Sequence, residues 1–356
     1  MKIISVVGAR PQFIKLAPLS AVLSNHYEEI IIHTGQHFDQ NMSELFFDQL
    51  GIKKPKYNLA INSFGHGRQT GEMLIKLEEV FEHEKPSLVI VFGDTTSTLA
   101  GSLAAVKMGI KVLHIEAGLR SFNRAMPEEI NRIVSDHTAD YLFAPTETAM
   151  NNLALEGLTE KSFLPGDIMV NSMEYAIARI NSSIELDKRI SELSQHKFVL
   201  ATFHRPYNVD NPHILQNILN VLGTFEIEVL FPVHPRTQQL LRNFVLEVPA
   251  NIKLLDPLGY LEFILLQRSA EMIITDSGGI QKEAYILKKP CITLRSETEW
   301  VETVVHGWNL LLDPKNPVDQ LVGAIRKFSP PVLHPPLFGI DPAHEMLNII
   351  KSNILI

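Results

Sequence analysis

Short apolar runs that alternate with amphipathic stretches constrain the fold of this chain more than any other feature. The runs are rich in Val and Ile without strict alternation, which fits strands buried on both faces of a parallel sheet covered by helices. Between them, apolar residues recur at helical spacing, as at Leu74, Leu77 and Phe81. The pattern predicts an α/β fold with doubly wound parallel sheets. The runs are Ile3–Val7, Ile30–Ile32, Leu88–Phe92, Val112–Ile115, Tyr141–Phe143, Phe198–Ala201, Val229–Phe231, Ile252–Leu255, Met272–Ile274 and Cys291–Leu294.

This pattern occurs twice, with a break near residues 165–181. A length of 356 residues exceeds what one hydrophobic core usually supports, so two domains are expected. A proline-rich segment, residues 329–336, separates a final helix, Ala343–Ile354, from the rest. We therefore expect two Rossmann-like domains with a cleft between them.

The charge balance excludes some classes of partner. With 40 acidic and 32 basic residues, the formal net charge is −8, which argues against binding of long polyanions such as nucleic acid. No apolar run reaches the roughly 18 residues of a membrane helix, and Arg10 comes too early for a signal peptide. A single cysteine, Cys291, excludes an internal disulfide and a Cys-based zinc site. These features predict a soluble cytoplasmic protein without a membrane partner.

Polar side chains follow almost every predicted strand. Open α/β sheets bind ligands beyond the carboxyl ends of their strands. Any one such residue is ordinarily a helix cap or a turn former, but the succession of charged residues predicts a lined cleft. The residues are Arg10 and Lys15, Gln36 and His37, Asp94, Glu116, His204 and Arg205, His234, Asp276 to Gly279, and Arg295.

The segment Asp276-Ser277-Gly278-Gly279 joins a predicted strand to a predicted helix. Glycines let a ligand approach the backbone, and free amides at a helix start attract phosphate. A cap followed by a tight turn explains the same residues equally well. Arg10 and Lys15, after the first strand, suit an anion, although Lys15 also fits a solvated helix position.

Two carboxylates, Asp94 and Glu116, end neighbouring strands, and Glu128 and Glu129 follow Pro127. Neighbouring anions and burial can push carboxyl pKa values apart, so that one group holds a proton while another accepts one. The alternative is that they cap helices and pair with nearby guanidinium groups, above all in the case of Glu129. The arginines concerned are Arg120, Arg124 and Arg132.

Several common sites are not expected. Gly8 is the single glycine of its turn, so the G-x-G-x-x-G fingerprint of dinucleotide binding is missing. His33 and His37 straddle a predicted strand end and lack the H-E-x-x-H spacing of a zinc helix. The serines lack the G-x-S-x-G turn of α/β hydrolases. We predict no metal and no bound cofactor.

Five longer motifs occur in a fixed order: GARPQFIK (Gly8–Lys15), GDTTST (Gly93–Thr98), HIEAGLR (His114–Arg120), PEEINR (Pro127–Arg132) and DSGGIQKEA (Asp276–Ala284). In these the chain resembles the non-hydrolysing UDP-N-acetylglucosamine 2-epimerases. The resemblance implies a GT-B architecture in which residues 1–169, with a returning helix at 340–356, form one domain. Residues 170–339 form the UDP-binding domain.

The resemblance also implies a homodimer that interconverts UDP-GlcNAc and UDP-ManNAc for bacterial surface polysaccharide precursors, without metal or redox cofactor. Matching positions imply catalytic roles for Asp94, Glu116, Glu128 and His204. They imply substrate or UDP binding by Arg10, Lys15, Arg205, His234, Ser277, Gly278, Gly279 and Glu283. Gln36, His37 and Gln69 match positions at which some bacterial members bind an activating second UDP-GlcNAc.

The sequence departs from the common members in two places. Pro206 and Tyr207 follow His204-Arg205 where another Arg and a Glu are usual, and Trp300-Val301-Glu302 replaces Arg-Pro-Glu. These segments are more similar to the branch that epimerises modified sugars such as UDP-2,3-diacetamido-glucuronic acid. A uronate needs an additional cation, for which the sequence offers Arg120, Arg124, Arg205 and Arg295.

The implied reaction needs a base and an acid on opposite faces of the sugar, since UDP leaves carbon 1 as the carbon 2 proton is removed. Three other functions use similar parts. A GT-B glycosyltransferase would need an acceptor, a hydrolysing epimerase would release free sugar and UDP, and a UDP-sugar sensor would need no carboxylates.

Overall fold

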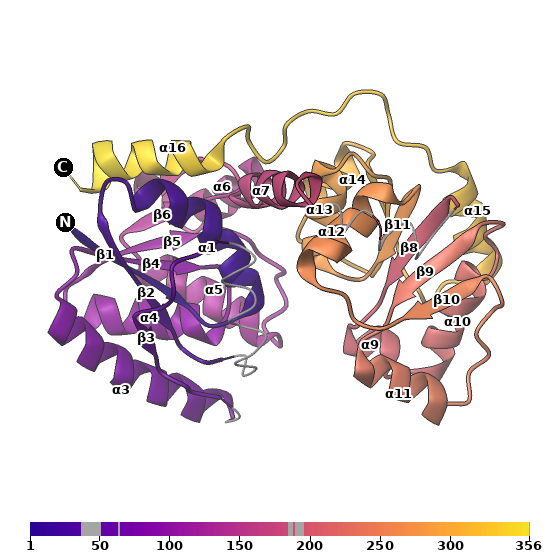
Figure 1. Cartoon of the computed structure of the whole chain (residues 1–356), viewed down its shortest axis with the longest axis horizontal. Coiled ribbons are helices and arrows are strands. Elements are labelled where there is room, and N and C mark those ends of the chain that lie inside the picture. The colour runs from indigo at the N-terminus through magenta and orange to yellow at the C-terminus, as the bar shows by residue number, and fades with distance from the viewer. Residues whose placement is uncertain (37–50, 63–64, 184–187, 189–195, 356) are drawn as a thin grey trace. The chain divides into compact units, whose positions relative to one another are not determined.

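A computed structural model describes residues 1–36, 51–62, 65–183, 188 and 196–355. The chain divides into two compact units (Figure 1). The first unit comprises Met1–Tyr175 and Pro336–Ile356, and the second comprises Ala176–Pro335. The division falls within helix α7 (Met169–Asn181), which begins in the first unit and ends in the second.

The first unit is built on a seven-stranded parallel sheet in the order β3-β2-β1-β4-β5-β6-β7. Val and Ile dominate its central strands, and every residue of the third of the predicted runs, Leu88–Phe92, is buried. The strands are β1 (Lys2–Val7), β2 (Glu28–His33), β3 (Tyr57–Asn58), β4 (Leu88–Phe92), β5 (Lys111–Ile115), β6 (Tyr141–Phe143) and β7 (Ser162–Phe163).

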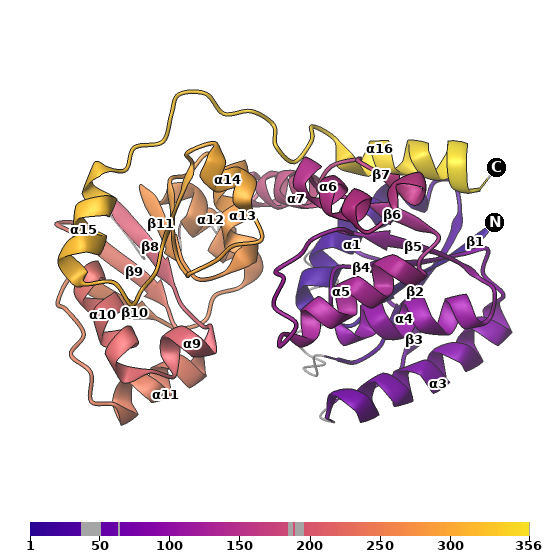
Figure 2. The ribbon, with the colours of Figure 1, turned by 180° about the vertical axis from the view of Figure 1, so that it is seen from behind.

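Helices cover both faces of this sheet. Helices α1 and α16 lie side by side on one face, and α3 and α4 pack together on the other (Figures 1 and 2). The packing of α16 on α1 returns the end of the chain to the first unit. The helices are α1 (Arg10–Leu23), α3 (His66–Glu84), α4 (Thr96–Lys107), α5 (Pro127–Thr138), α6 (Glu147–Leu155), the 3₁₀ turn η1 (Thr159–Lys161), α16 (Pro342–Ile349) and the π-helical turn η2 (Ile350–Ile354).

The second unit repeats this design with a six-stranded parallel sheet in the order β10-β9-β8-β11-β12-β13. Its core joins strand residues such as Phe231 to the apolar face of α10, including Ile218 and Leu222. The strands are β8 (Phe198–Thr202), β9 (Glu228–Pro232), β10 (Ile252–Leu255), β11 (Met272–Thr275), β12 (Cys291–Leu294) and β13 (Asn309–Leu312). The helices are α9 (Pro206–Val209), α10 (Pro212–Leu222), α11 (Pro235–Asn243), α12 (Tyr260–Ser269), α13 (Gly278–Ile286), α14 (Val301–Val305) and α15 (Val318–Lys327).

The predicted α/β class with two parallel sheets is confirmed, and each of the ten apolar runs lies within a strand. Strands β3, β7 and β13 are additional at the sheet edges. No helix among the described residues is long and apolar enough to cross a membrane.

Each sheet has one point at which the strand order reverses. In the first unit β2 and β3 extend from one side of β1 and β4 to β7 from the other; in the second unit the reversal lies between β8 and β11. In folds of this kind, ligands bind at the carboxyl ends of the strands beside such a reversal. The candidate residues that follow β1, β4, β8 and β11 therefore lie where ligand binding is expected.

Candidate functional site

Lys15 and Glu116 form an ion pair at the strand ends of the first unit. Lys15 lies on α1 and Glu116 directly follows β5, and each side chain is only 10% exposed. Opposite charges at such close range attract each other, so the ammonium group holds the carboxylate in place. The burial of Lys15 excludes the interpretation of this lysine as a solvated helix residue.

The backbone at Glu116 is left-handed, with a φ of 71° that is rare for a residue with a side chain. The amides of Glu116 and Ala117 both donate to the carbonyl of Phe143, at 3.0 Å each. Gly93, at the end of β4, lies so close that a methyl placed on it would be 3.2 Å from both Glu116 Oε2 and Lys15 Nζ. The turn that leads to Asp94 thus packs directly against the Lys15–Glu116 pair.

Asp94 is held by two residues of α5. Arg132 donates to its carboxylate, and the side-chain amide of Asn131 donates to its backbone carbonyl at 2.9 Å. The same Arg132 donates to Glu129 at 2.9 Å. Asp94 keeps 32% of its side chain exposed, so its carboxylate is anchored on one side and open on the other.

Glu129 and its neighbour Glu128 differ in the number of hydrogen bonds and ion pairs that hold their side chains. Burial raises the pKa of Glu129, but hydrogen bonds from the Ser121 and Phe122 amides and from Arg132 outweigh it and hold the pKa below the ordinary value. Glu129 is therefore a fixed carboxylate that organises the loop before α5. Glu128 is half-buried, and within the described part of the chain its side chain forms no hydrogen bond or ion pair.

The remaining predicted residues of the first unit lie near the β1 switch point or on α3. Arg10 begins α1 and is half-buried, whereas Gln69 is buried on α3. Gln36 accepts hydrogen bonds from Ser97, at 2.7 Å from its hydroxyl and 3.1 Å from its amide. His37 lies outside the described residues.

In the second unit a buried carboxylate organises the first candidate loop. Asp276, fully buried after β11, accepts hydrogen bonds from the amide of Arg205 at 3.0 Å and from the side chain of Asn208 at 3.1 Å. Its Oδ1 also lies 3.2 Å from Nδ1 of His204. The imidazole of His204 is 47% exposed, so Asp276 orients the ring and leaves Nε2 on the open side.

The start of α13 follows directly, at Ser277 and Gly278. Gly278 is buried, and a methyl placed on it would come within 2.2 Å of Glu299 Oε1, whereas Gly279 is exposed. Glu299 in turn lies 3.0 Å from the guanidinium of Arg295, whose side chain is 5% exposed. A carboxylate therefore lies against the helix start that the sequence predicts to bind phosphate, with a buried cation behind it.

Two further candidates lie on α13 and at the start of α11. Glu283 is buried on α13 and accepts a hydrogen bond of 2.7 Å from Gln267. His234 is exposed at the N-cap of α11, where its Nδ1 accepts from the amide of Arg236 at 3.2 Å. That bond assigns the proton of a neutral ring to Nε2, which faces away from the helix.

The sequence indicated Arg132 only as an alternative partner of the carboxylates, and it did not single out Asn131 or Asp276 as positioning residues. Each of them contacts a residue at least 37 positions away in the sequence. Arg132 and Asn131 contact Asp94, and Asp276 contacts His204 and Arg205. The motifs PEEINR and DSGG contained these residues, but spacing alone does not show which strand end a helix side chain reaches.

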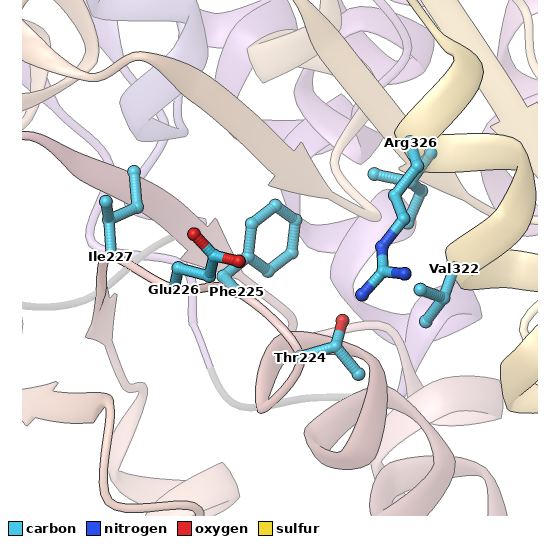
Figure 3. Close-up of a pocket in the computed structure, with 7 residues that line it drawn as sticks. Thr224, Phe225, Glu226, Ile227, Val322 and Arg326 are labelled. Atoms are coloured by element: carbon cyan, nitrogen blue, oxygen red, sulfur yellow. The ribbon is translucent and has the colours of Figure 1, made fainter.

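A metal centre is not evident in the described ranges. No group of three or more His, Cys, Asp or Glu side chains there is placed to hold a metal ion. A pocket of about 380 Å³ lies at the amino-terminal edge of the second sheet, before β9 (Figure 3). Phe225, Val322 and Arg326 are among its lining residues, and none of the predicted site residues lines it.

Comparison with known proteins places this arrangement in a family. A sequence profile described as UDP-N-acetylglucosamine 2-epimerase matches residues 21–331. The chain belongs to the UDP-N-acetylglucosamine 2-epimerase family.

Relatives within the 2-epimerase family include an archaeal and a bacterial protein. A UDP-N-acetylglucosamine 2-epimerase homolog from Methanococcus maripaludis is 52% identical over 336 residues, which cover 93% of each chain. UDP-2,3-diacetamido-2,3-dideoxy-D-glucuronate 2-epimerase from Pseudomonas aeruginosa is 48% identical over 320 residues, or 88% of each chain. The crystal structure of Methanocaldococcus jannaschii UDP-GlcNAc 2-epimerase in complex with UDP-GlcNAc and UDP matches 99% of both chains, with 42% identity and a TM-score of 0.90.

Proposed function

We propose that this chain is a non-hydrolysing 2-epimerase that interconverts UDP-GlcNAc and UDP-ManNAc by eliminating UDP and adding it back. The observation that carries the proposal is the juxtaposition, at one edge of a parallel sheet, of Glu116 with the turn that bears Asp94. Family membership supports the reaction class, and the relative from M. jannaschii bears the name of this activity.

The carbon 2 proton of a 2-acetamido sugar is too weakly acidic for simple removal at neutral pH. Loss of UDP from carbon 1 as a base takes this proton gives a glycal, in which a carbon 1–carbon 2 double bond replaces the broken C–O and C–H bonds. UDP then adds back to carbon 1 while an acid delivers a proton to the opposite face of carbon 2. The scheme needs two proton-transfer groups, which Asp94, Glu116 and Glu128 supply.

The three carboxylates differ in ways that suit divided roles. Glu116 is held in place by Lys15 and Asp94 by Arg132. Glu128 has no ion-pair partner among the described residues, so its side chain is not fixed in this way. We propose that these groups share the proton transfers.

The departing UDP must be stabilised and retained. We propose that the start of α13, at Ser277, Gly278 and Gly279, holds the diphosphate through backbone amides. Arg205 would add positive charge, and His204, oriented by Asp276, and His234 of the same unit would contribute hydrogen bonds. Glu283 would bind the ribose hydroxyls through its buried carboxylate.

A second candidate substrate is a 2,3-diacetamido uronate. The 48% identity to the P. aeruginosa glucuronate epimerase favours it, together with the replacements at Pro206 and Trp300. Arg120 does not supply the additional cation, since Asp136 and Glu156 already bind its guanidinium, each at 2.7 Å. Arg124, Arg205 and Arg295 remain as candidates. By the same family resemblance we expect a homodimer in the cytoplasm, and Gln36 and Gln69 as contacts of an activating UDP-sugar.

The purified protein should be incubated separately with UDP-GlcNAc and with UDP-2,3-diacetamido-glucuronate, without acceptor, and followed by NMR and mass spectrometry. A new UDP-sugar of unchanged mass supports the epimerase and identifies its substrate. Net release of UDP with free sugar would instead indicate a hydrolysing enzyme. No reaction until an acceptor is added would indicate a glycosyltransferase.

A further inference from the structure

A buried histidine connects the two turns that carry the candidate carboxylates. His114 lies on β5, two residues before Glu116, and is fully buried. Its Nε2 lies 2.7 Å from the carbonyl oxygen of Gly93, the residue before Asp94. Its Nδ1 lies 2.7 Å from Oδ1 of Asp136, a fully buried residue of α5.

The carbonyl oxygen of Gly93 cannot donate a hydrogen bond, so Nε2 of His114 carries the proton of that bond. Burial raises the pKa of Asp136, but the charges of His114 and Arg120 outweigh it and keep the pKa below the ordinary value. Arg120 binds both Asp136 and Glu156, so its guanidinium joins the two carboxylates.

The second oxygen of Asp136 extends this cluster to the Glu116 turn. It accepts a hydrogen bond of 3.0 Å from the amide of Gly118, whose φ is 81°. Glu116 itself has a φ of 71° and Gly93 a φ of 63°. A left-handed backbone costs free energy at a residue that has a side chain, so it persists only where neighbouring contacts hold it in place. His114 and Asp136 provide such contacts on both turns.

We propose that His114 and Asp136 are positioning residues that fix Asp94 and Glu116 relative to each other. His114 holds the Gly93 carbonyl, and Asp136 holds the Gly118 amide and the ring of His114. Neither residue is required to touch substrate. The proposal rests on the proposed function, since it assigns a role in the proton transfers of that reaction.

Two substitutions separate the two hydrogen bonds of the ring. In His114→Gln the longer amide reaches the position of Nε2 and can donate to Gly93, whereas in His114→Asn the shorter amide reaches the position of Nδ1 and can bond only Asp136. The matched control is Glu84→Gln, at a second buried carboxylate of the same unit, which binds Lys2, Lys56 and Tyr57 and lies apart from these turns. All three variants are compared with the wild type at a temperature at which each is fully folded.

Misplacement of a catalytic group by about 1 Å costs about 100-fold in rate. We expect kcat of His114→Asn to fall about 100-fold, with KM and the affinity for UDP within about threefold of the wild type, and kcat of His114→Gln to remain within about tenfold. Glu84→Gln should keep the wild-type kcat. Equal kcat values for both His114 variants and the wild type would overturn the proposal. Losses of kcat that merely parallel the fall in melting temperature from variant to variant would also overturn it.

Should the His114 variants not fold, the unaltered chain provides the second test. A ¹⁵N-histidine NMR spectrum at pH 8 should contain one ring whose Nε2–H proton is protected from exchange with solvent, as its hydrogen bond to the Gly93 carbonyl requires. A spectrum in which no ring has a protected Nε2–H proton would overturn the proposal. A wild-type chain that folds but exchanges no carbon 2 proton in any UDP-sugar would refute the proposed function, whereas active wild type with unimpaired His114 variants refutes only the positioning role.

Discussion

The ammonium of Lys15 pairs with the carboxylate of Glu116 across the carboxyl edge of the first sheet, with each side chain only 10% exposed. The pair joins the first helix to the end of β5, over a separation of 101 residues. A buried ion pair contributes little net stability, because desolvation of two charges offsets their attraction. Its location beside Gly93 and Asp94 therefore indicates a functional role.

Glu116→Gln tests whether this carboxylate transfers a proton. The amide keeps the shape of the side chain but cannot accept the carbon 2 proton, so kcat should fall at least ~100-fold while UDP affinity stays near the wild-type value. Turnover assays and isothermal titration with UDP measure the two quantities. Glu79→Gln, on an exposed part of α3, is the control, and full activity of Glu116→Gln would remove Glu116 from the mechanism.

Gly93→Ala tests the close packing of the two turns. A methyl at Gly93 meets Glu116 and Lys15 and is also strained by the φ of 63°. Gly109, with a φ of 70°, is the matched control, since a methyl there meets no atom of the described residues within 4 Å. Both variants should lose about 1–2 kcal/mol of stability from left-handed backbone. Turnover should drop at least ~10-fold in Gly93→Ala alone, and an equal effect on both would argue against the packing.

Gly278→Ala tests the helix start as the diphosphate site. The added methyl would collide with Glu299 and cover the backbone amides, so UDP should bind about tenfold more weakly or worse. Gly323→Ala on α15, where a methyl meets nothing described within 4 Å, should keep wild-type UDP affinity and gain helix stability. Isothermal titration with UDP makes the comparison. Unchanged affinity in Gly278→Ala would assign the diphosphate to another part of the second unit.

The lowered pKa of Glu84 predicts a pH dependence of the free energy of unfolding that is separate from catalysis. Hydrogen bonds from Lys2, Lys56 and Tyr57 lower the pKa of this carboxyl from 4.5 to about 2. A depressed carboxyl pKa stabilises the folded state fully above the unfolded value, and this contribution disappears as pH falls from about 4.5 towards 2. Urea denaturation at pH 7 and pH 3 should show a smaller pH effect in Glu84→Gln than in the wild type. Identical pH effects in the two proteins would contradict this role.

The sequence was sufficient for the elements whose stabilisation is local. Runs such as Leu88–Phe92 predict buried strands because the residues themselves favour that environment, and Asp94 and Glu116 follow strands of this kind. The edge strand β3 was not predictable in this way. Strand β3 consists of Tyr57 and Asn58 and owes its existence to pairing with β2 rather than to an apolar run.

The internal partners of the site residues could not be predicted for a related reason. The backbone amides of Ser121 and Phe122 donate to Glu129 and not to Glu128. The direction of these amides depends on the conformation of the loop, which the sequence does not show. The position of Lys15 in a helix fits a solvated side chain as well as a buried one, and only the tertiary fold brings it to Glu116. Motif spacing identifies the residue types at a strand end, but the tertiary fold determines which of them are already bonded to one another.

The most direct test of the account is the reaction in deuterated water. If UDP elimination and re-addition proceed with proton transfer by the carboxylates at the β4 and β5 strand ends, solvent deuterium should appear at carbon 2 of the product UDP-sugar, as NMR and mass spectrometry detect. The account predicts one deuterium at carbon 2 in each product molecule. Epimerised product that keeps its original carbon 2 proton would contradict it.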